Sequence, residues 1–116
     1  MIKQQTQDNL YQNESLRNFA ELISNINLLK NKKYGCPWQN MQTHETLIPY
    51  LIEESHEFID SIKSNDKENM KEELGDLLLQ IMLHSEIERE KNLFSITDVI
   101  NSCLLYTSPS PRDRVL

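Results

Sequence analysis

Two pairs of acidic residues constrain the fold of this chain more than any other feature. Glu54 and Glu57 form the first pair. Glu73 and Asp76 form the second, after fifteen intervening residues. Because each pair is spaced i, i+3, its two carboxylates lie on one face of an α-helix. Two such faces side by side would gather the hard oxygen ligands that hold Mg²⁺ or Mn²⁺. The spacing therefore predicts two adjacent helices with a divalent cation between them.

A further acidic residue directly precedes each pair, Glu53 in the first segment and Glu72 in the second. Six carboxylates could therefore converge on one small volume, and that much like charge calls for a cation to offset it. The alternative is an ordinary solvent-exposed acidic face, which is the more common situation for acid on helices. Both pairs border apolar stripes here, and this favours metal binding.

Few helix breakers interrupt the chain. Its 116 residues include only two glycines and four prolines, and two of the prolines fall within the last eight residues. Together with abundant Glu, Lys, Leu, Asn and Ile, this favours an all-α fold over a sheet. The length suits one domain with one core. We therefore predict an all-α bundle of about four helices.

Several classes of protein are disfavoured by composition. No apolar run approaches the roughly 20 residues that span a bilayer, and the polar N-terminal segment lacks the apolar region of a signal peptide. Cys36 and Cys103 are too far apart for a Cys-x-x-Cys motif, which favours a reduced, cytoplasmic setting. The net charge of −6 argues against a nucleic-acid partner. Nine of the eighteen acidic residues lie between Glu53 and Asp76, so an anionic substrate would need metal ions to approach.

Start and stop signals predict four helices. Their expected ranges are 14 or 15 to 33, 43 to 63 or 64, 66 to 91 or 92, and from 95 or 97 to about 103. Thr43 and Asp66 suit the N-caps of the second and third helices. Gly35 and Pro37 end the first helix, and a loop follows to Met41.

Three segments are expected along the chain. Residues 1–13 are predicted to be a flexible lead-in to a helical domain over 14–103, which we expect to be truncated at its C-terminus. Residues 104–116 contain two prolines and no apolar period. We expect them to be a disordered, non-native tail and exclude them from the fold.

The third expected helix carries two apolar stripes. The first contains Met70, Leu74, Leu77, Leu78, Ile81 and Met82, and the second contains Leu79, Leu83 and Ile87. A helix that is apolar nearly all round is buried on most sides, so the second stripe is expected to face another subunit. Glu73 and Asp76 border this segment, where an unpaired carboxylate costs several kcal/mol or takes up a proton. Gly75 between them predicts that something approaches the backbone closely there.

Four segments resemble the MazG-type nucleotide pyrophosphohydrolases. They are Cys-Pro-Trp-Gln at 36–39, Gln-Thr-His-Glu at 42–45, Glu-Glu-x-x-Glu at 53–57 and Lys-Glu-Glu-Leu-Gly-Asp-Leu-Leu at 71–78. The resemblance covers about residues 15–102 and implies the all-α NTP pyrophosphatase fold, assembled as a dimer or higher oligomer. It also implies Mg²⁺-dependent cleavage of a nucleoside triphosphate to monophosphate and pyrophosphate, with Mn²⁺ as a possible substitute. Gln39 departs from the family pattern, which usually has Asp there, and the basic segment that commonly follows the fourth helix is absent.

The resemblance also implies roles for the acidic residues. The implied metal ligands are Glu54, Glu57, Glu73 and Asp76. Glu53 and Glu72 would be supporting or water-orienting carboxylates. Catalysis of this reaction is mostly positioning and charge neutralisation, and Glu53 or Glu57 would take the proton from water. Glu53, Glu57 and Glu72 are therefore the expected catalytic residues.

Lys71 and Trp38 are the expected substrate-binding residues, and each has an alternative role. Lys71 could reach a phosphate or merely offset nearby acid. Trp38 could stack on a base or anchor its loop to the core. The three histidines, at 44, 56 and 84, are expected to be structural or solvent-facing.

Three functions remain open from the sequence. The first is a housecleaning NTP pyrophosphohydrolase acting on ordinary or damaged nucleotides. The second is a relative with a narrower substrate, such as dCTP, dUTP or phosphoribosyl-ATP. The third is a non-catalytic helical module for oligomerisation or partner binding. The intact acidic pairs argue against the third, since a binding module has no need of four acids at a helix junction.

Overall fold

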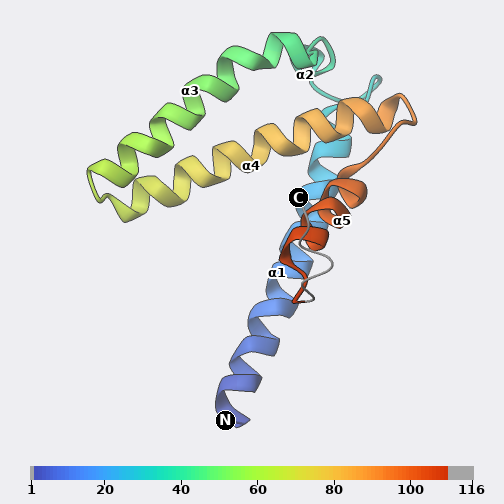
Figure 1. Ribbon diagram of the computed structural model, residues 1–116. Coiled ribbons are helices and arrows are strands. Elements are labelled where there is room, and N and C mark those ends of the chain that lie inside the picture. Colours follow the sequence, from blue (N-terminus) through green and yellow to red (C-terminus); the bar gives the residue numbers. More distant parts are fainter. Residues whose placement is uncertain (1, 110–116) are drawn as a thin grey trace. The chain divides into compact units, whose positions relative to one another are not determined.

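The computed structural model describes residues 2–109, and over this range it contains helices and no β-strand (Figure 1). The helices are α1 (Ile2–Leu29), α2 (Pro37–Asn40), α3 (His44–Lys63), α4 (Lys67–Glu90) and α5 (Ile96–Thr107). The predicted all-α class is thus confirmed. Two compact units divide the chain, Met1–Asn40 with α1 and α2, and Met41–Leu116 with α3, α4 and α5. None of the described helices is long and apolar enough to cross a membrane.

Helix α1 begins at Ile2, so the expected start near Glu14 is wrong. The early residues are Gln- and Asn-rich and exposed, but they include no breaker. Side chains also support this segment locally: Gln4 Nε2 donates to Asp8 Oδ1 at 3.0 Å, one helical turn away. The division into a lead-in over 1–13 and a domain over 14–103 stays a prediction.

The end of α1 is also earlier than expected, at Leu29 rather than Lys33. The Asn31 side-chain oxygen accepts hydrogen bonds from the backbone N–H groups of Lys33 and Tyr34, which turns the chain away from the helix. Gly35 then passes so close to the end of α1 that a Cβ would lie 2.4 Å from the carbonyl oxygens of Leu29 and Asn31. Glycine is required there by close approach. The expected loop after it contains the single helical turn of α2.

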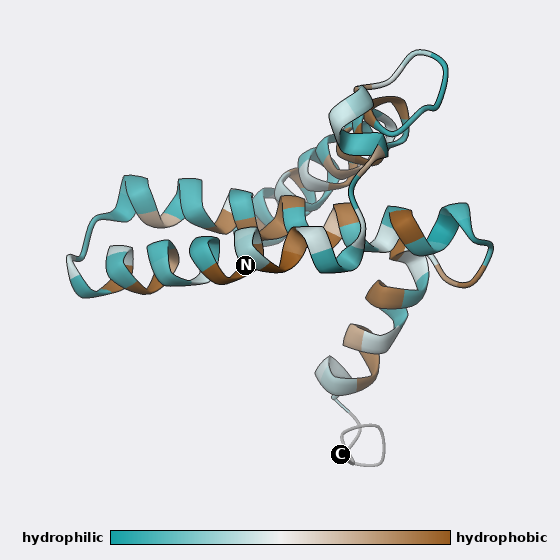
Figure 2. Ribbon diagram, turned by 90° about the horizontal axis from the view of Figure 1, so that it is seen from above, coloured by the Kyte–Doolittle hydropathy of each residue, from teal (hydrophilic) through white to brown (hydrophobic). Residues whose placement is uncertain are grey.

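Helices α3 and α4 form an antiparallel hairpin, and their predicted boundaries are confirmed (Figure 1). Thr43 caps α3 in a capping box with Thr46, as the N-cap prediction requires. Asp66 caps α4 by accepting from the N–H of Asn69 at 3.1 Å. The turn between the helices places Asn65 at a positive φ of 54°, a conformation that asparagine tolerates well. Both helices carry hydrophilic and hydrophobic residues in alternation along their length (Figure 2).

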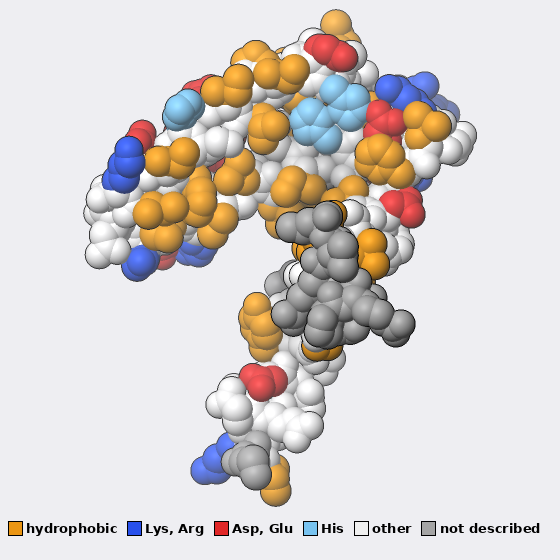
Figure 3. All heavy atoms as spheres, viewed as in Figure 1, with side chains coloured by type: hydrophobic (Ala, Val, Ile, Leu, Met, Phe, Trp, Pro, Cys, Tyr) orange, Lys and Arg blue, Asp and Glu red, His pale blue; other side chains and the backbone are white. Residues whose placement is uncertain are grey.

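The second stripe of α4 is buried within the chain, contrary to the prediction, and the first stripe is exposed only in part, since Met82 is buried. Leu83 and Ile87, expected to face another subunit, are buried within the chain, and Leu79 is half-buried. By contrast, Leu74 is 50% exposed and Ile81 is 46% exposed in the first stripe. Figure 3 shows hydrophobic side chains gathered on the surface of the hairpin. Burial depends on which elements pack on each face, and a helical period alone does not contain that information.

Helix α5 begins after Ser95, whose backbone N–H donates to Asp98 Oδ2 at 2.9 Å. It continues to Thr107, so residues 104–107, expected to be disordered, are helical. No proline or glycine occurs between Ser95 and Pro109 to stop it. The rest of the expected tail, from residue 110 to residue 116, lies outside the described residues.

Candidate active site

The hairpin of α3 and α4 brings the two acidic pairs together. One carboxylate oxygen from each of four residues lies within 4.8 Å of the others, and these residues are Glu54, Glu57, Glu73 and Asp76. We refer to this set as the carboxylate cage. It lies between two helices whose caps and turn fix their register, so the i, i+3 spacing on each helix becomes one cluster. The arrangement is the one that the sequence predicts.

Burial within the carboxylate cage is graded. Glu73 is buried, Glu54 and Glu57 are half-buried, and Asp76 is exposed. One oxygen of Glu54 and one of Glu73, the Oε2 atom in each case, are shielded from solvent without a hydrogen-bond partner. An anionic ligand can therefore approach from the Asp76 side, while the inner carboxylates are held out of water.

The electrostatics of the cage are unfavourable without a cation. Burial, followed by the charge of Asp76, raises the pKa of Glu54 to about 7. Burial and a hydrogen bond with Glu57 raise the pKa of Glu73. In the part of the chain that the structure describes, no lysine or arginine forms an ion pair with these four carboxylates. A buried, unpartnered carboxylate oxygen is stabilised by a metal ion or a proton, so the residues present fit a divalent cation.

Glu53 and Glu72 do not belong to the cage. Both side chains are exposed, and the expected convergence of six carboxylates is wrong because only four meet. Each lies one residue from a cage member, and one residue turns an α-helix by about 100°. Their supporting or catalytic roles stay predictions.

Lys71 and Trp38 have surroundings that differ from a formed binding site. Lys71 Nζ lies 2.5 Å from Glu68 Oε2 on the exposed surface, and this contact raises the pKa of Lys71. The pairing matches the alternative in which Lys71 offsets nearby acid, and its phosphate role stays a prediction. Trp38 belongs to α2 in the first unit and is 48% exposed. Its stacking on a base also stays a prediction.

Gly75 has open space around it. A Cβ built there would meet no atom within 4 Å. The close approach predicted at this glycine is therefore not made by any described part of the chain. The Gly75→Ala variant tests whether a bound substrate approaches the backbone at this position.

A second polar cluster on the same hairpin was missed by sequence reasoning. His44 Nδ1 lies 2.7 Å from His84 Nδ1, and His44 Nε2 lies 2.5 Å from Glu88 Oε1. The two rings are stacked, with centroids 5.0 Å apart and planes within 2°. The register that opposes Glu57 to Glu73, continued along the hairpin, carries His44 to a place between His84 and Glu88. Extending the register of the acidic pairs along the hairpin would therefore have predicted this cluster from the sequence.

The sequence of this chain is similar to a known protein family and to several characterised proteins. A family profile described as the MazG nucleotide pyrophosphohydrolase domain matches residues 42–105. The nucleoside triphosphate pyrophosphohydrolase/pyrophosphatase MazG of Thermotoga maritima is 49% identical over 84 residues, which are 72% of this chain and 32% of that protein. The nucleoside triphosphate pyrophosphohydrolase of Escherichia coli K12 is 35% identical over 67% of this chain and 30% of its own length. That of Mycobacterium tuberculosis is 34% identical over 72% of this chain and 26% of its own length. The chain thus spans about a third or less of these relatives.

Proposed function

Because the chain belongs to the MazG nucleotide pyrophosphohydrolase family, we propose that it hydrolyses nucleoside triphosphates to monophosphate and pyrophosphate, with Mg²⁺ as its cofactor. The observation that carries the proposal is the carboxylate cage, with four carboxylate oxygens within 4.8 Å of one another. Relatives of T. maritima, E. coli and M. tuberculosis are named as enzymes of this reaction, which supports the same activity here.

The cage residues would hold the cation. Glu54 and Glu73 each offer an oxygen that lacks any other partner, and Glu57 and Asp76 complete the set. When bound, Mg²⁺ or Mn²⁺ would supply the positive charge that neutralises both the carboxylates and the triphosphate oxygens. The chain carries a net charge of −6, so without a bound cation its surface would repel the anionic triphosphate.

The chain's own residues then position the reacting groups. Hydrolysis between the α- and β-phosphates consumes one water and releases a monophosphate and pyrophosphate. Glu57 is the better placed of the two expected bases, because it is half-buried in the cage while Glu53 is exposed outside it. A Glu57 carboxylate oxygen would accept the proton from the attacking water. Orientation of that water between fixed groups supplies much of the rate enhancement.

The assembly proposed is a homodimer or higher homo-oligomer. Its interface would use the exposed first stripe of α4, with Leu74, Leu78 and Ile81, because contiguous exposed apolar surface of this kind usually marks an association site. A cytoplasmic setting is proposed as well, and the two free thiols, Cys36 and Cys103, fit it.

Product analysis tests the proposed reaction. The purified chain would be incubated with each of the eight common NTPs and dNTPs, with Mg²⁺ or with EDTA, and the products separated by ion exchange. We expect monophosphate and pyrophosphate, both lost in EDTA, and the relative rates would distinguish broad from narrow specificity. Release of orthophosphate would contradict the proposal. Absence of turnover on all eight substrates would favour the non-catalytic module.

Glu54→Gln and Asp76→Asn give the matched variants for this experiment. Each removes one charge from the cage without changing its shape, and each is expected to abolish Mg²⁺-dependent turnover while the helical circular dichroism is unchanged. Glu90→Gln removes an exposed acidic residue of α4 outside the cage and serves as the control. Wild-type rates in either cage variant would refute the assignment.

A further inference from the structure

His44, His84 and Glu88 connect α3 and α4 at the end of the hairpin away from the turn, and we refer to them as the histidine clamp. His44 is the first residue of α3, and the other two lie one turn apart near the end of α4. Glu54 follows His44 by ten residues on α3. Asp76 precedes His84 by eight residues on α4, so the carboxylate cage is about 12–15 Å from the clamp along the helix axes. The cage therefore lies between two fixed ends of the hairpin, the α3–α4 turn and the clamp.

The histidine clamp opposes sliding of α3 along α4 in both directions. His44 Nδ1 lies 2.7 Å from His84 Nδ1, and His44 Nε2 lies 2.5 Å from Glu88 Oε1. His84 and Glu88 are four residues apart, about 6 Å along α4, so the His44 ring is held from both sides. A shift of one residue, about 1.5 Å, would stretch one of the two contacts beyond hydrogen-bond length. A neutral and a charged His44 can both make the two contacts, because each contact needs only one proton between its two atoms.

The contact with Glu88 is the stronger side of the clamp. The Glu88 side chain is only 12% exposed, and Lys91 Nζ lies 3.6 Å from the same Oε1 atom. The hydrogen bond from His44 lowers the pKa of Glu88, so the carboxylate is ionised at neutral pH. A hydrogen bond to an ionised group in a partly buried position is shorter and stronger than one between neutral groups in water. It therefore fixes the position of His44 against α4.

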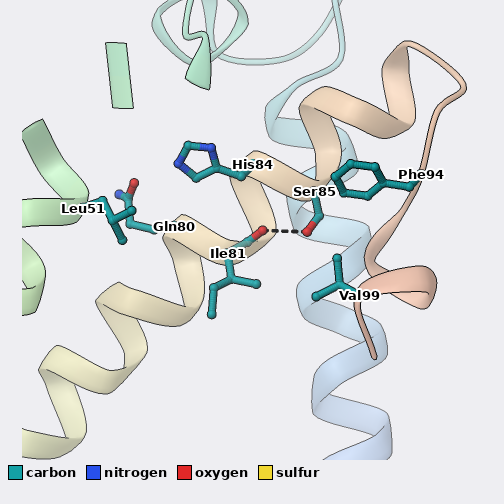
Figure 4. A pocket seen from close by; sticks show the side chains of 7 residues that line it. All are labelled: Leu51, Gln80, Ile81, His84, Ser85, Phe94 and Val99. Carbon is teal, nitrogen blue, oxygen red and sulfur yellow. Dashed lines mark hydrogen bonds between the residues drawn. The ribbon is translucent and has the colours of Figure 1, made fainter. Parts of the chain in front are cut away.

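Apolar packing contributes less to the register between the clamp and the cage. A cavity of about 270 Å³ borders this part of the hairpin, and Leu51, Gln80 and Ile81 are among its lining residues (Figure 4). In sequence these three residues lie between the cage residues and the clamp residues of their own helices. Side chains that border a cavity lack contacts on one side, and apolar contacts have no preferred direction. The directional contacts of the clamp are therefore the main restraint on the register at this end.

The register matters to the cage because its ligands come from both helices. Glu54 and Glu57 belong to α3, Glu73 and Asp76 belong to α4, and one oxygen of each lies within 4.8 Å of the others. Four carboxylates without a cation repel one another, and this repulsion acts to separate the helices. Mg²⁺ requires a near-ideal octahedron with oxygens at about 2.0–2.1 Å, whereas Ca²⁺ accepts a flexible set at about 2.3–2.6 Å. A displaced helix would therefore weaken Mg²⁺ binding more than Ca²⁺ binding.

We propose that His44 is a positioning residue, which fixes the register of α3 against α4 and thereby presets the carboxylate cage for Mg²⁺. The inference rests on the proposed function, because it takes the cage as the cation site. It adds a residue that acts through the cage and touches neither the cation nor the substrate. His84 and Glu88 hold His44 from its two sides, so each is needed for the same effect.

Selectivity between two cations tests this role. The full chain would be titrated calorimetrically with Mg²⁺ and, separately, with Ca²⁺ at pH 8, above the pKa of about 7 of Glu54. His44→Ala is expected to raise the Kd for Mg²⁺ about tenfold and that for Ca²⁺ by no more than about twofold. Glu88→Gln keeps an oxygen acceptor for His44 but loses the charge, so its effect on the Mg²⁺ Kd should be about threefold. Val99→Ala shortens a half-buried side chain of α5 and is the control for lost stability, with both affinities unchanged.

The change in selectivity separates positioning from a general loss of stability, which would not favour one cation over the other. Equal changes of the two Kd values in His44→Ala, or wild-type values for both, would overturn the positioning role and leave the cage as a cation site. If circular dichroism shows that His44→Ala loses helix, Glu88→Gln decides, and an unchanged Mg²⁺ Kd in that variant overturns the role. A wild-type chain that binds neither cation would instead contradict the cage and the proposed function, and no variant is needed to see it.

Discussion

His44 and His84 lie with their Nδ1 atoms 2.7 Å apart and their rings stacked, at the end of the hairpin away from the α3–α4 turn. Two neutral imidazoles can share one proton in this geometry, but two imidazolium rings would repel each other. Burial, and then the charge of His44, lowers the pKa of His84 below its ordinary 6.5. The hydrogen bond from His44 lowers the pKa of Glu88.

The first prediction is that the contribution of His84 to the free energy of unfolding falls as the pH drops below about 6.5. Glu54, whose pKa is raised to about 7, contributes in the opposite direction below pH 7, so the histidine contribution is measured as a difference from a variant. The unfolded chain then protonates His84 while the folded chain resists, so the unfolded state binds more protons and stability is lost through the folded pKa. Glu88 acts in the same direction at lower pH, since the stabilisation from its depressed pKa is complete above the ordinary value of 4.5 and is lost as the pH falls through the folded pKa. Urea denaturation between pH 8 and pH 5 would measure the slope.

The His84→Leu variant isolates this contribution. It removes the group that titrates, so between about pH 5 and pH 7 the unfolding free energy is expected to increase less with rising pH than it does in the wild-type chain. His56→Leu, at an exposed position of α3, is the control. An unchanged slope in His84→Leu would show that the histidine pair is not the origin of the effect.

The second prediction concerns metal binding and stability. If Mg²⁺ or Mn²⁺ binds the folded cage and not the unfolded chain, as proposed, a concentration 100 times the Kd should stabilise the chain by about 2.7 kcal/mol. Glu73→Gln is expected to raise the melting temperature of the metal-free chain, because it removes a buried carboxylate whose Oε2 atom has no partner, and to abolish the stabilisation by metal. Differential scanning calorimetry with EDTA and with Mg²⁺ would measure both effects. A destabilised metal-free Glu73→Gln chain would argue that the carboxylate is satisfied in some other way.

The third prediction is a pH dependence of the metal affinity. The pKa of Glu54 is about 7, raised first by burial and then by Asp76, so a proton competes with the cation below that pH. The apparent Kd for Mg²⁺ should be nearly constant above pH 7 and rise about tenfold for each unit below it. Titration calorimetry at pH 8, 7 and 6 would measure this. In Glu54→Gln the remaining affinity is expected to lose that dependence.

The fourth prediction concerns Gly75, between two cage residues. Because a Cβ there meets nothing within 4 Å, Gly75→Ala should stabilise α4 by about 1 kcal/mol through helix propensity. If the glycine is needed for close approach of the substrate, kcat/KM falls while stability rises. Urea denaturation and kinetics on the same preparation separate the two effects. Unchanged kinetics would remove the predicted functional reason for this glycine.

How far the sequence predicts this molecule depends on whether the signal is local. Thr43 and Asp66 mark the starts of α3 and α4 because capping is a local interaction, and the i, i+3 spacing of Glu73 and Asp76 follows from the same helix. The His44–His84 contact depends on the register between two helices, so neither residue reveals it alone. The start of α1 was missed because a polar, exposed helix has no apolar period to detect.

The fifth prediction concerns the exposed apolar side chains of α4, because the stripe expected to lie at a subunit interface is buried within the chain. Leu83 and Ile87 are buried within the chain, whereas Leu74 and Ile81 are about half exposed. If the chain self-associates through the exposed stripe, Leu74→Glu and Ile81→Glu each place a charge against an apolar partner in the dimer. Each substitution should therefore raise the dissociation constant of the dimer at least tenfold. Leu93→Glu, at an exposed position after α4, is the control. Sedimentation velocity over a range of concentrations would measure the shift, and a wild-type chain that stays monomeric at the highest concentration would exclude this interface.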